Sequence, residues 1–177
     1  MKAVLISIQP KWCDMIADGK KTVEVRKTRP IIETPFKCYI YETKTRSDMP
    51  TFIDEDGHVL YTGRGQVIGE FVCGRIDTIG KRGIKNNFDY CYQSLNVFGN
   101  DDIEVEITAI RKSCIPKAEL NAYGATSMRL FAWHISDLKI YDKPKELSEF
   151  GKYGFGEPVP LKRPPQSWMY VEDGICP

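Results

Sequence analysis

The fold of this chain is organised around eight consecutive residues, Gly19-Lys20-Lys21-Thr22-Val23-Glu24-Val25-Arg26. The glycine follows a run with helical apolar spacing and supplies the left-handed residue that ends a helix. The β-branched residues after it favour a strand. Because side chains alternate across a strand, Thr22, Glu24 and Arg26 are expected on one face and the two valines on the opposite, core-facing side.

The segments before this stretch predict a strand and then a helix. Residues 3–8, Ala-Val-Leu-Ile-Ser-Ile, form an apolar, β-branched run that is typical of a buried strand. Pro10 suits the first turn of a helix. Trp12 and Ile16 recur at helical spacing before Asp18-Gly19 ends the helix, and we expect Trp12 to be a core residue.

The charged side chains of the stretch have a plain interpretation and a functional one. In the plain interpretation they form an exposed strand face with an incidental Glu–Arg pair, which contributes about 0–1 kcal/mol to stability. The functional interpretation rests on the pattern Gly-x-Lys-x-x-Glu-x-Arg, formed by Gly19, Lys21, Glu24 and Arg26. With a short strand and helix before it, this pattern resembles the ASCH domain family.

The resemblance implies an α+β fold with a PUA-like β-barrel and short flanking helices. It also implies association with RNA and, in some family members, hydrolysis of modified nucleosides or RNA. The motif spans residues 19–26, and its strand-helix context extends the resemblance over residues 1–27. The irregular spacing of later strands, without regular strand-helix alternation, agrees with an α+β barrel rather than a doubly wound sheet.

Length and composition predict a single domain over residues 1–177, with an extended, proline-rich C-terminal segment from residue 142. The net charge is only +1, from 25 basic and 24 acidic residues, so the whole chain has no basic excess. Five basic residues fall between Lys20 and Arg29 against one acid, whereas acidic residues gather at 54–56 and 101–106. A local basic surface is therefore expected around the motif.

The cysteines and the N-terminus predict a reduced, soluble, cytoplasmic protein. Six cysteines and two histidines show no metal-ligand spacing, so we expect no metal and no other cofactor. The apolar run at residues 3–8 is too short for a signal peptide or a membrane span, and no membrane partner is expected. His134, beside Trp133, has no recognisable partner and is interpreted as a hydrogen-bonded structural residue.

The remaining chain predicts more strands than helices. Helix and strand both fit residues 101–112, and a short helix is expected from Pro116 to Tyr123, ending at Gly124. Residues 43–57 are expected to form a long loop or hairpin, and residues 81–85 a second basic loop. Strands are predicted at residues 36–42 and 59–61, at 66–79 with a bend at its glycines, and at 128–135 and 138–141.

The function that we favour is recognition of RNA, or of a nucleoside or nucleotide, in a cleft beside the first helix. Lys21 and Arg26 are expected to contact phosphate or base, and Glu24 to orient one of them. The further candidate ligand-binding residues are Lys20, Thr22, Arg163 and Trp168. Arg163 and Trp168 belong to a terminal segment that either docks on the core or folds over the cleft, where Trp168 would stack on a base.

Two other functions remain open. Some members of the family that this chain resembles are amidohydrolases acting on N4-acylated cytidine. Their catalytic lysine matches Lys21, but they have a threonine where this chain has Glu24. If the protein is an enzyme, Lys21 and Glu24 are the candidate catalytic residues. The other possibility is a structural or protein-interaction domain. Because Lys21 lies at the edge of its strand, its replacement by alanine is expected to leave the fold intact.

Overall fold

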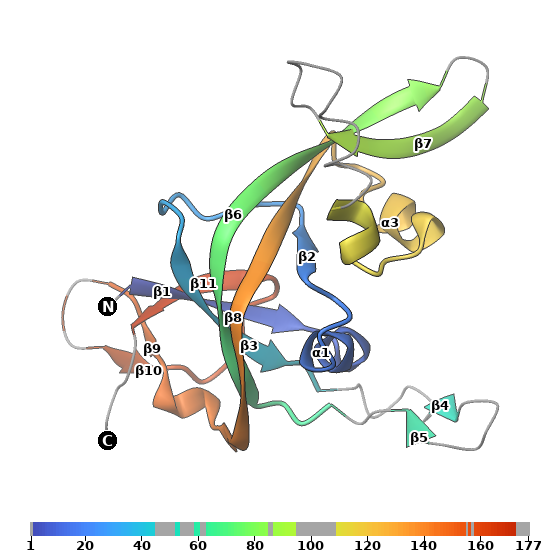
Figure 1. The fold of residues 1–177 in the computed structure, drawn as a ribbon. Coiled ribbons are helices and arrows are strands. Elements are labelled where there is room, and N and C mark those ends of the chain that lie inside the picture. Colours follow the sequence, from blue (N-terminus) through green and yellow to red (C-terminus); the bar gives the residue numbers. More distant parts are fainter. Residues whose placement is uncertain are drawn as a thin grey trace. The chain divides into compact units, whose positions relative to one another are not determined.

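The computed structural model describes residues 2–44, 52–53, 59–60, 63–84, 87–94, 109–154, 156 and 158–172. The chain divides into two compact units. The first unit comprises Met1–Gly19, Phe36–Val72 and Asp137–Pro177, and the second comprises Lys20–Pro35 and Cys73–Ser136. Two long neighbouring strands, β6 (Val67–Ile84) and β8 (Arg129–Lys145), contribute residues to both units (Figure 1).

The first unit is built on β1 (Lys2–Ile8), which confirms the strand predicted at residues 3–8. β1 lies between β3 (Phe36–Glu42), to which it runs parallel, and the antiparallel β11 (Trp168–Glu172). Being paired on both edges, it is buried along almost its whole length, as its unbroken apolar run requires. The core beside these strands contains Ala3, Leu5, Tyr39, Tyr41, Val67, Phe150, Leu161 and Val171.

Helix α1 (Pro10–Ala17) begins and ends as the sequence predicts. Pro10 occupies the first turn, and Gly19 has a φ of +70°, the left-handed conformation that glycine adopts without strain. The buried residues of the helix are Cys13 and Ile16. Trp12 is only partly buried, with the Lys11 ammonium 4.4 Å from its ring centre, so its prediction as a core residue was wrong.

The second unit contains the motif strand β2 (Val23–Arg26), which pairs antiparallel with β8. β7 (Asn87–Ser94) pairs with the later part of β6, and α3 (Lys117–Tyr123) ends at Gly124 as predicted. Val23 and Val25 enter a core with Ile79, Ala109, Leu120, Leu130 and Ala132. The expected assignment of the two valines to the core is confirmed.

Several expected elements differ in extent from the structure. The expected basic loop at 81–85 is wrong over residues 81–84, which continue β6, while Lys85 lies outside the described residues. The two closing strands are one continuous strand, β8. Residues 109–112 are helical, and residues 101–108 lie outside the description. Within the predicted hairpin region, β4 (Phe52–Ile53) pairs with β5 (Val59–Leu60).

The C-terminal segment is more regular than its prolines predict. The turn expected near residues 145–150 is η1 (Leu147–Glu149), held by a capping box between Glu146 and Glu149. After it come β9 (Gly151–Lys152), β10 (Val159–Pro160) and β11. Pairing with β1 makes β11 part of the first unit's sheet, so the segment docks on the core instead of running extended over the surface from residue 142.

These elements make a mostly-sheet α+β fold with few helices, as expected. In the first unit the neighbouring strands follow the order β10-β9-β11-β1-β3-β6-β8, and in the second unit β2 continues from β8 while β7 pairs with β6. The strand pairs in the described ranges leave this sheet open, so the PUA-like barrel stays a prediction. No helix among the described residues is long and apolar enough to cross a membrane.

Candidate functional site

Three charged side chains of the motif meet in the second unit. Two ion pairs meet at the Glu24 carboxylate: Lys21 Nζ lies 3.1 Å from Oε2, and Arg26 Nε lies 3.0 Å from Oε1. Their residues are 1%, 5% and 8% exposed for Lys21, Glu24 and Arg26, so this is a buried ion cluster. The interpretation as an incidental pair on an exposed strand face is wrong.

The register between β2 and β8 gives the cross-strand neighbours of Glu24 and Arg26. Glu24 lies opposite Trp133 and Arg26 opposite Phe131, and the indole of Trp133 is wholly buried. Side chains directly opposite each other on paired strands lie side by side on the same face and contact one another. The motif charges therefore have aromatic cross-strand neighbours on β8, on the face of β2 that lies opposite the valine core.

Lys21 is held by a segment that lies 92 positions away in sequence. Its Nζ donates to the main-chain carbonyl of Ser113 at 2.6 Å. Ser113 follows the helical turn at 109–112: its N–H donates to the Ala109 carbonyl, and its hydroxyl donates to the Ile110 carbonyl at 2.6 Å. The left-handed φ of 57° at Cys114 then redirects the chain. The Ser113 carbonyl is thus aimed at the lysine by a firmly held turn.

The burial of Lys21 corrects the expectation that it is an edge residue outside the core. It is among the largest fully buried side chains of the described residues. A buried ammonium is stable only where oxygen atoms compensate for its lost hydration, and here a carboxylate and a carbonyl do so. Replacement by alanine is therefore expected to disturb the fold, contrary to the expectation from the sequence.

The residues around the cluster differ in exposure. Thr22 is partly buried, and its main chain is held on both sides: its N–H donates to the Lys112 carbonyl and its carbonyl accepts from Ile135. Lys20, Lys27 and Arg29 are exposed, as the local basic surface predicted for this stretch requires. Arg29 lies with its guanidinium 5.9 Å from the Phe131 ring, beside the end of β2.

Tyr123, at the end of α3, interacts electrostatically with Arg26 and Glu24 of the cluster. Burial raises the pKa of its phenol; Arg26 opposes that rise and Glu24 adds to it. The Lys27 ammonium lies 5.1 Å from the Tyr123 ring centre. The neutral phenol thus stands next to the ion cluster at ordinary pH and can donate or accept a hydrogen bond.

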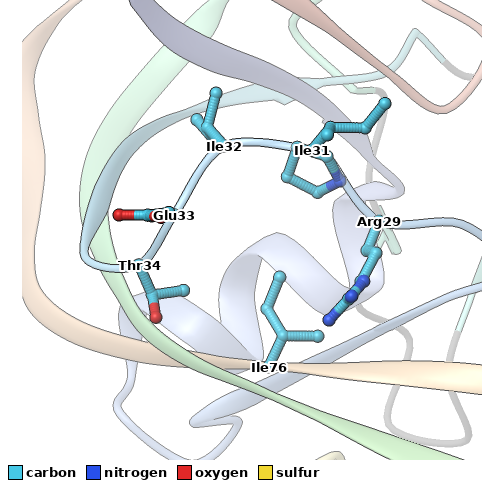
Figure 2. Close-up of a pocket in the computed structure, with 7 residues that line it drawn as sticks. Arg29, Ile31, Ile32, Glu33, Thr34 and Ile76 are labelled. Atoms are coloured by element: carbon cyan, nitrogen blue, oxygen red, sulfur yellow. The ribbon is translucent and has the colours of Figure 1, made fainter.

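A pocket follows the motif strand in the same unit, and the sequence analysis had not identified it. It has a volume of about 530 Å³ and is lined by residues 29–34 and Ile76. Figure 2 shows the Ile76 side chain pointing into the space that the loop encloses, while Ile31 and Ile32 point away from it. The prolines that flank the loop, Pro30 and Pro35, are the signal that could have drawn attention to it.

A second polar group, also missed from sequence, joins Arg75, Asp77 and His134. His134 Nε2 lies 2.6 Å from Asp77 Oδ2 and donates to it, because an ionised carboxylate only accepts. Arg75 Nη2 donates to the same oxygen at 3.0 Å. Burial acts to raise the pKa of Asp77, but the hydrogen bonds and charges of His134 and Arg75 lower it overall. His134 is therefore hydrogen-bonded, as interpreted, through a partner 57 positions away.

The two C-terminal candidates belong to the first unit, unlike the motif residues. Trp168 begins β11, where it lies opposite Ile6, and its ring meets Tyr170 edge-on at 5.4 Å between centres. Arg163 is exposed in the segment before that strand. Their contribution to the site stays a prediction. In the ranges that the structure describes, no group of three or more His, Cys, Asp or Glu residues is placed to hold a metal ion.

Comparison with known proteins identifies the fold. No protein-family model matches the chain, and no curated protein matches it in sequence. The structure of an ASCH protein from Zymomonas mobilis matches 96% of this chain and 87% of its own, with 18% identity and a TM-score of 0.53. A Tyr-to-Phe variant of that protein matches with a TM-score of 0.57 and 19% identity, covering 97% of this chain and 91% of its own. This chain therefore has the fold of the ASCH structures, and the resemblance seen in the motif is confirmed for the fold.

Proposed function

We propose that this protein binds RNA or a nucleotide through the Lys21-Glu24-Arg26 cluster and the exposed cations beside it. The observation that carries the proposal is the Glu24 carboxylate, which holds both cations within 3.1 Å in a stretch flanked by Lys20, Lys27 and Arg29. A folded protein keeps buried charges only where they are well compensated, so a buried cluster on a basic surface is a candidate functional site.

The burial of the three residues divides their roles. The Lys21 side chain is 0% exposed and acts as a positioning residue, which fixes Glu24. Glu24 in turn fixes the Arg26 guanidinium, whose side chain is 10% exposed and is the group of the cluster that a ligand reaches most readily. A guanidinium suits this role better than an ammonium does, because its planar fork of donors matches the geometry of a phosphate or a base edge.

The charges favour an anionic partner. Two cations share one carboxylate, and the exposed Lys20, Lys27 and Arg29 add positive charge around them. Such clusters attract phosphates and hold them with a strong dependence on salt concentration. A ligand that carries one or a few phosphates fits this site better than a neutral nucleoside does.

The same residues are less suited to hydrolysing an acylated cytidine than to binding RNA or a nucleotide. A lysine that acts as a nucleophile must reach its substrate. The Lys21 side chain is 0% exposed, and its Nζ already contacts oxygens of Ser113 and Glu24. We therefore treat the amidohydrolase and the protein-interaction domain as alternative outcomes of one experiment.

The experiment is a titration of fluorescently labelled single-stranded RNA, read by anisotropy at several salt concentrations. With two or three phosphates bound, log affinity should fall against log salt with a slope of about −1.4 to −2.1. Arg26→Gln should weaken binding about tenfold, because a hydrogen bond to a charged group contributes about 1.5–3 kcal/mol. Lys143→Gln, which removes an exposed cation of the first unit, is the matched control and should have little effect.

The same protein samples are then incubated with N4-acetylcytidine. The hydrolase function is favoured over the binding function if two results are obtained together: release of cytidine that requires Lys21 and Glu24, and RNA affinity that is unchanged in Arg26→Gln. An absence of both activities would favour the interaction domain. RNA affinity equal in the parent and in Arg26→Gln would show that the cluster is not the binding site.

A further inference from the structure

The pocket after the motif strand has walls of two kinds. Residues 29–34 curve around it and Ile76 of β6 closes it, with a volume of about 530 Å³. In Figure 2 the side chains of Ile31, Ile32 and Glu33 point away from the enclosed space, so the main chain of the loop forms much of the wall. A main-chain wall presents N–H and C=O groups, whereas Ile76 presents an aliphatic surface.

This combination matches a nucleobase. A base has a flat apolar face, which packs against an aliphatic or aromatic side chain, and an edge of alternating donors and acceptors, which main-chain groups can read. The volume lies within the range of about 300–1,000 Å³ that is usual for small-molecule sites. It is suited to one nucleoside rather than to a stacked run of bases.

Arg29 connects the pocket with the proposed phosphate site. It lines the pocket, and its guanidinium lies 5.9 Å from the Phe131 ring. Phe131 is the residue directly opposite Arg26 in the pairing of β2 with β8. Arg29 thus supplies a cation in the pocket wall that also lies close to the cross-strand partner of Arg26.

We infer that the pocket of residues 29–34 and Ile76 binds the base of one nucleotide, while Arg29 binds the phosphate of that same nucleotide. The inference rests on the proposed function and makes it more specific. The ligand is a nucleoside monophosphate, or a single unstacked nucleotide within RNA, and no covalent step is involved. Base discrimination then comes from the main chain of the loop, independently of the buried ion cluster.

The test is isothermal titration calorimetry with four probes and one base-free control. The probes are the 5′-monophosphates of adenosine, cytidine, guanosine and uridine, and the control is ribose 5-phosphate. At least one probe should bind about tenfold or more tightly than ribose 5-phosphate, because the base adds apolar and hydrogen-bonded contacts. Equal affinity of all five compounds would overturn the inference.

Two substitutions locate the effect. Ile76→Phe places a larger side chain in the pocket and should weaken the preferred monophosphate about tenfold while leaving ribose 5-phosphate unchanged. Arg29→Gln should weaken both compounds, also about tenfold, because it removes a charged hydrogen-bond donor. Lys143→Gln is its matched control, since Lys143 is an exposed cation of the first unit that does not line the pocket, and it should change affinity less than about twofold.

Photocrosslinking of the unmodified protein supplies a measurement that does not depend on how the variants fold. 4-Thiouridine 5′-monophosphate should crosslink to the peptides that contain residues 29–34 or Ile76. Crosslinks found only in other peptides would overturn the inference. The two proposals fail separately: if Arg26→Gln weakens RNA binding but Ile76→Phe leaves monophosphate affinity unchanged in a folded protein, the pocket is not the base site while the cluster still binds RNA.

Discussion

Replacement of Lys21 by methionine tests the central feature of the site, because methionine keeps an unbranched chain of similar length and removes only the ammonium group. In the parent, Lys21 Nζ donates to the Ser113 carbonyl at 2.6 Å and lies 3.1 Å from Glu24 Oε2, with its side chain wholly buried. The variant leaves both oxygens in place without this donor. The fold should persist at lower stability.

The magnitude follows from what each partner loses. A buried carbonyl without its donor costs about 1–3 kcal/mol. Breaking a buried ion pair costs about 3–5 kcal/mol when the other charge is left alone, but Glu24 still has Arg26 Nε at 3.0 Å. The variant no longer has to bury an ammonium group, and this gain offsets part of the lost stability. We expect a net loss of about 1–3 kcal/mol, or a fall in melting temperature of about 2–12 °C for a chain of this size.

The assay is urea unfolding at pH 7, followed by tryptophan fluorescence and by far-ultraviolet circular dichroism. Of the three tryptophans, Trp133 belongs to the second unit and is wholly buried opposite Glu24, so its share of the emission reports on this unit. Coincidence of the two transitions is the condition for treating unfolding as two-state. Lys143→Met, at an exposed lysine of β8, is the matched control and should change the free energy of unfolding by no more than about 0.5 kcal/mol.

The double variant Lys21→Met/Glu24→Gln completes a cycle that isolates the pair. Contacting charged residues usually show coupling of about 0.5–3 kcal/mol, and we expect a value in that range. A Lys21→Met variant as stable as the Lys143→Met control would refute the reasoning, since a buried ammonium with two oxygen partners cannot be removed without effect. Lys21→Ala should be the least stable of the set, because it also leaves a cavity.

Three further predictions concern Glu24, the contact between Asp77 and His134, and the C-terminal strand. Glu24→Gln should reduce RNA affinity modestly if Glu24 only positions its neighbours, whereas any cytidine-releasing activity should fall about 100-fold if it acts in acid–base catalysis; parallel binding and rate measurements separate the two. Asp77→Asn should lower stability at neutral pH by about 1–3 kcal/mol, because it weakens the contact with His134. Because the pKa of Asp77 is lower in the folded state, the extra stability of the parent over Asp77→Asn is complete above the ordinary pKa of 3.8 and is lost as pH falls through the folded-state pKa. A difference in the free energy of unfolding between parent and variant that is the same at pH 6 and at pH 2 would contradict this. Deletion of residues 162–177 removes β11 from its pairing with β1 and should lower the melting temperature by several degrees. If RNA affinity per folded molecule falls as well, the deleted segment, which contains Trp168, is part of the site.

The sequence by itself determined the elements whose causes are local. The apolar run before Gln9, Pro10 in the first helical turn, and a left-handed Gly19 predict β1, α1 and the start of β2, and each is present. It could also be predicted that the valines of β2 lie on one face and the charged residues Glu24 and Arg26 on the other, because strand alternation is a property of the backbone. The motif likewise indicated the fold that the ASCH structures share.

Only the tertiary structure decided which of these residues are buried and what they contact. The Ser113 carbonyl that holds Lys21 comes from 92 positions away, and the Asp77 that holds His134 from 57 positions away. Such pairs leave no periodic signal in the sequence. The same is true of β11, whose proline-rich surroundings indicated a surface segment although its main chain pairs with β1. The physical reason is that burial and hydrogen-bond partners are set by non-local strand pairing, whereas local patterns determine only where a strand begins and which way its side chains alternate.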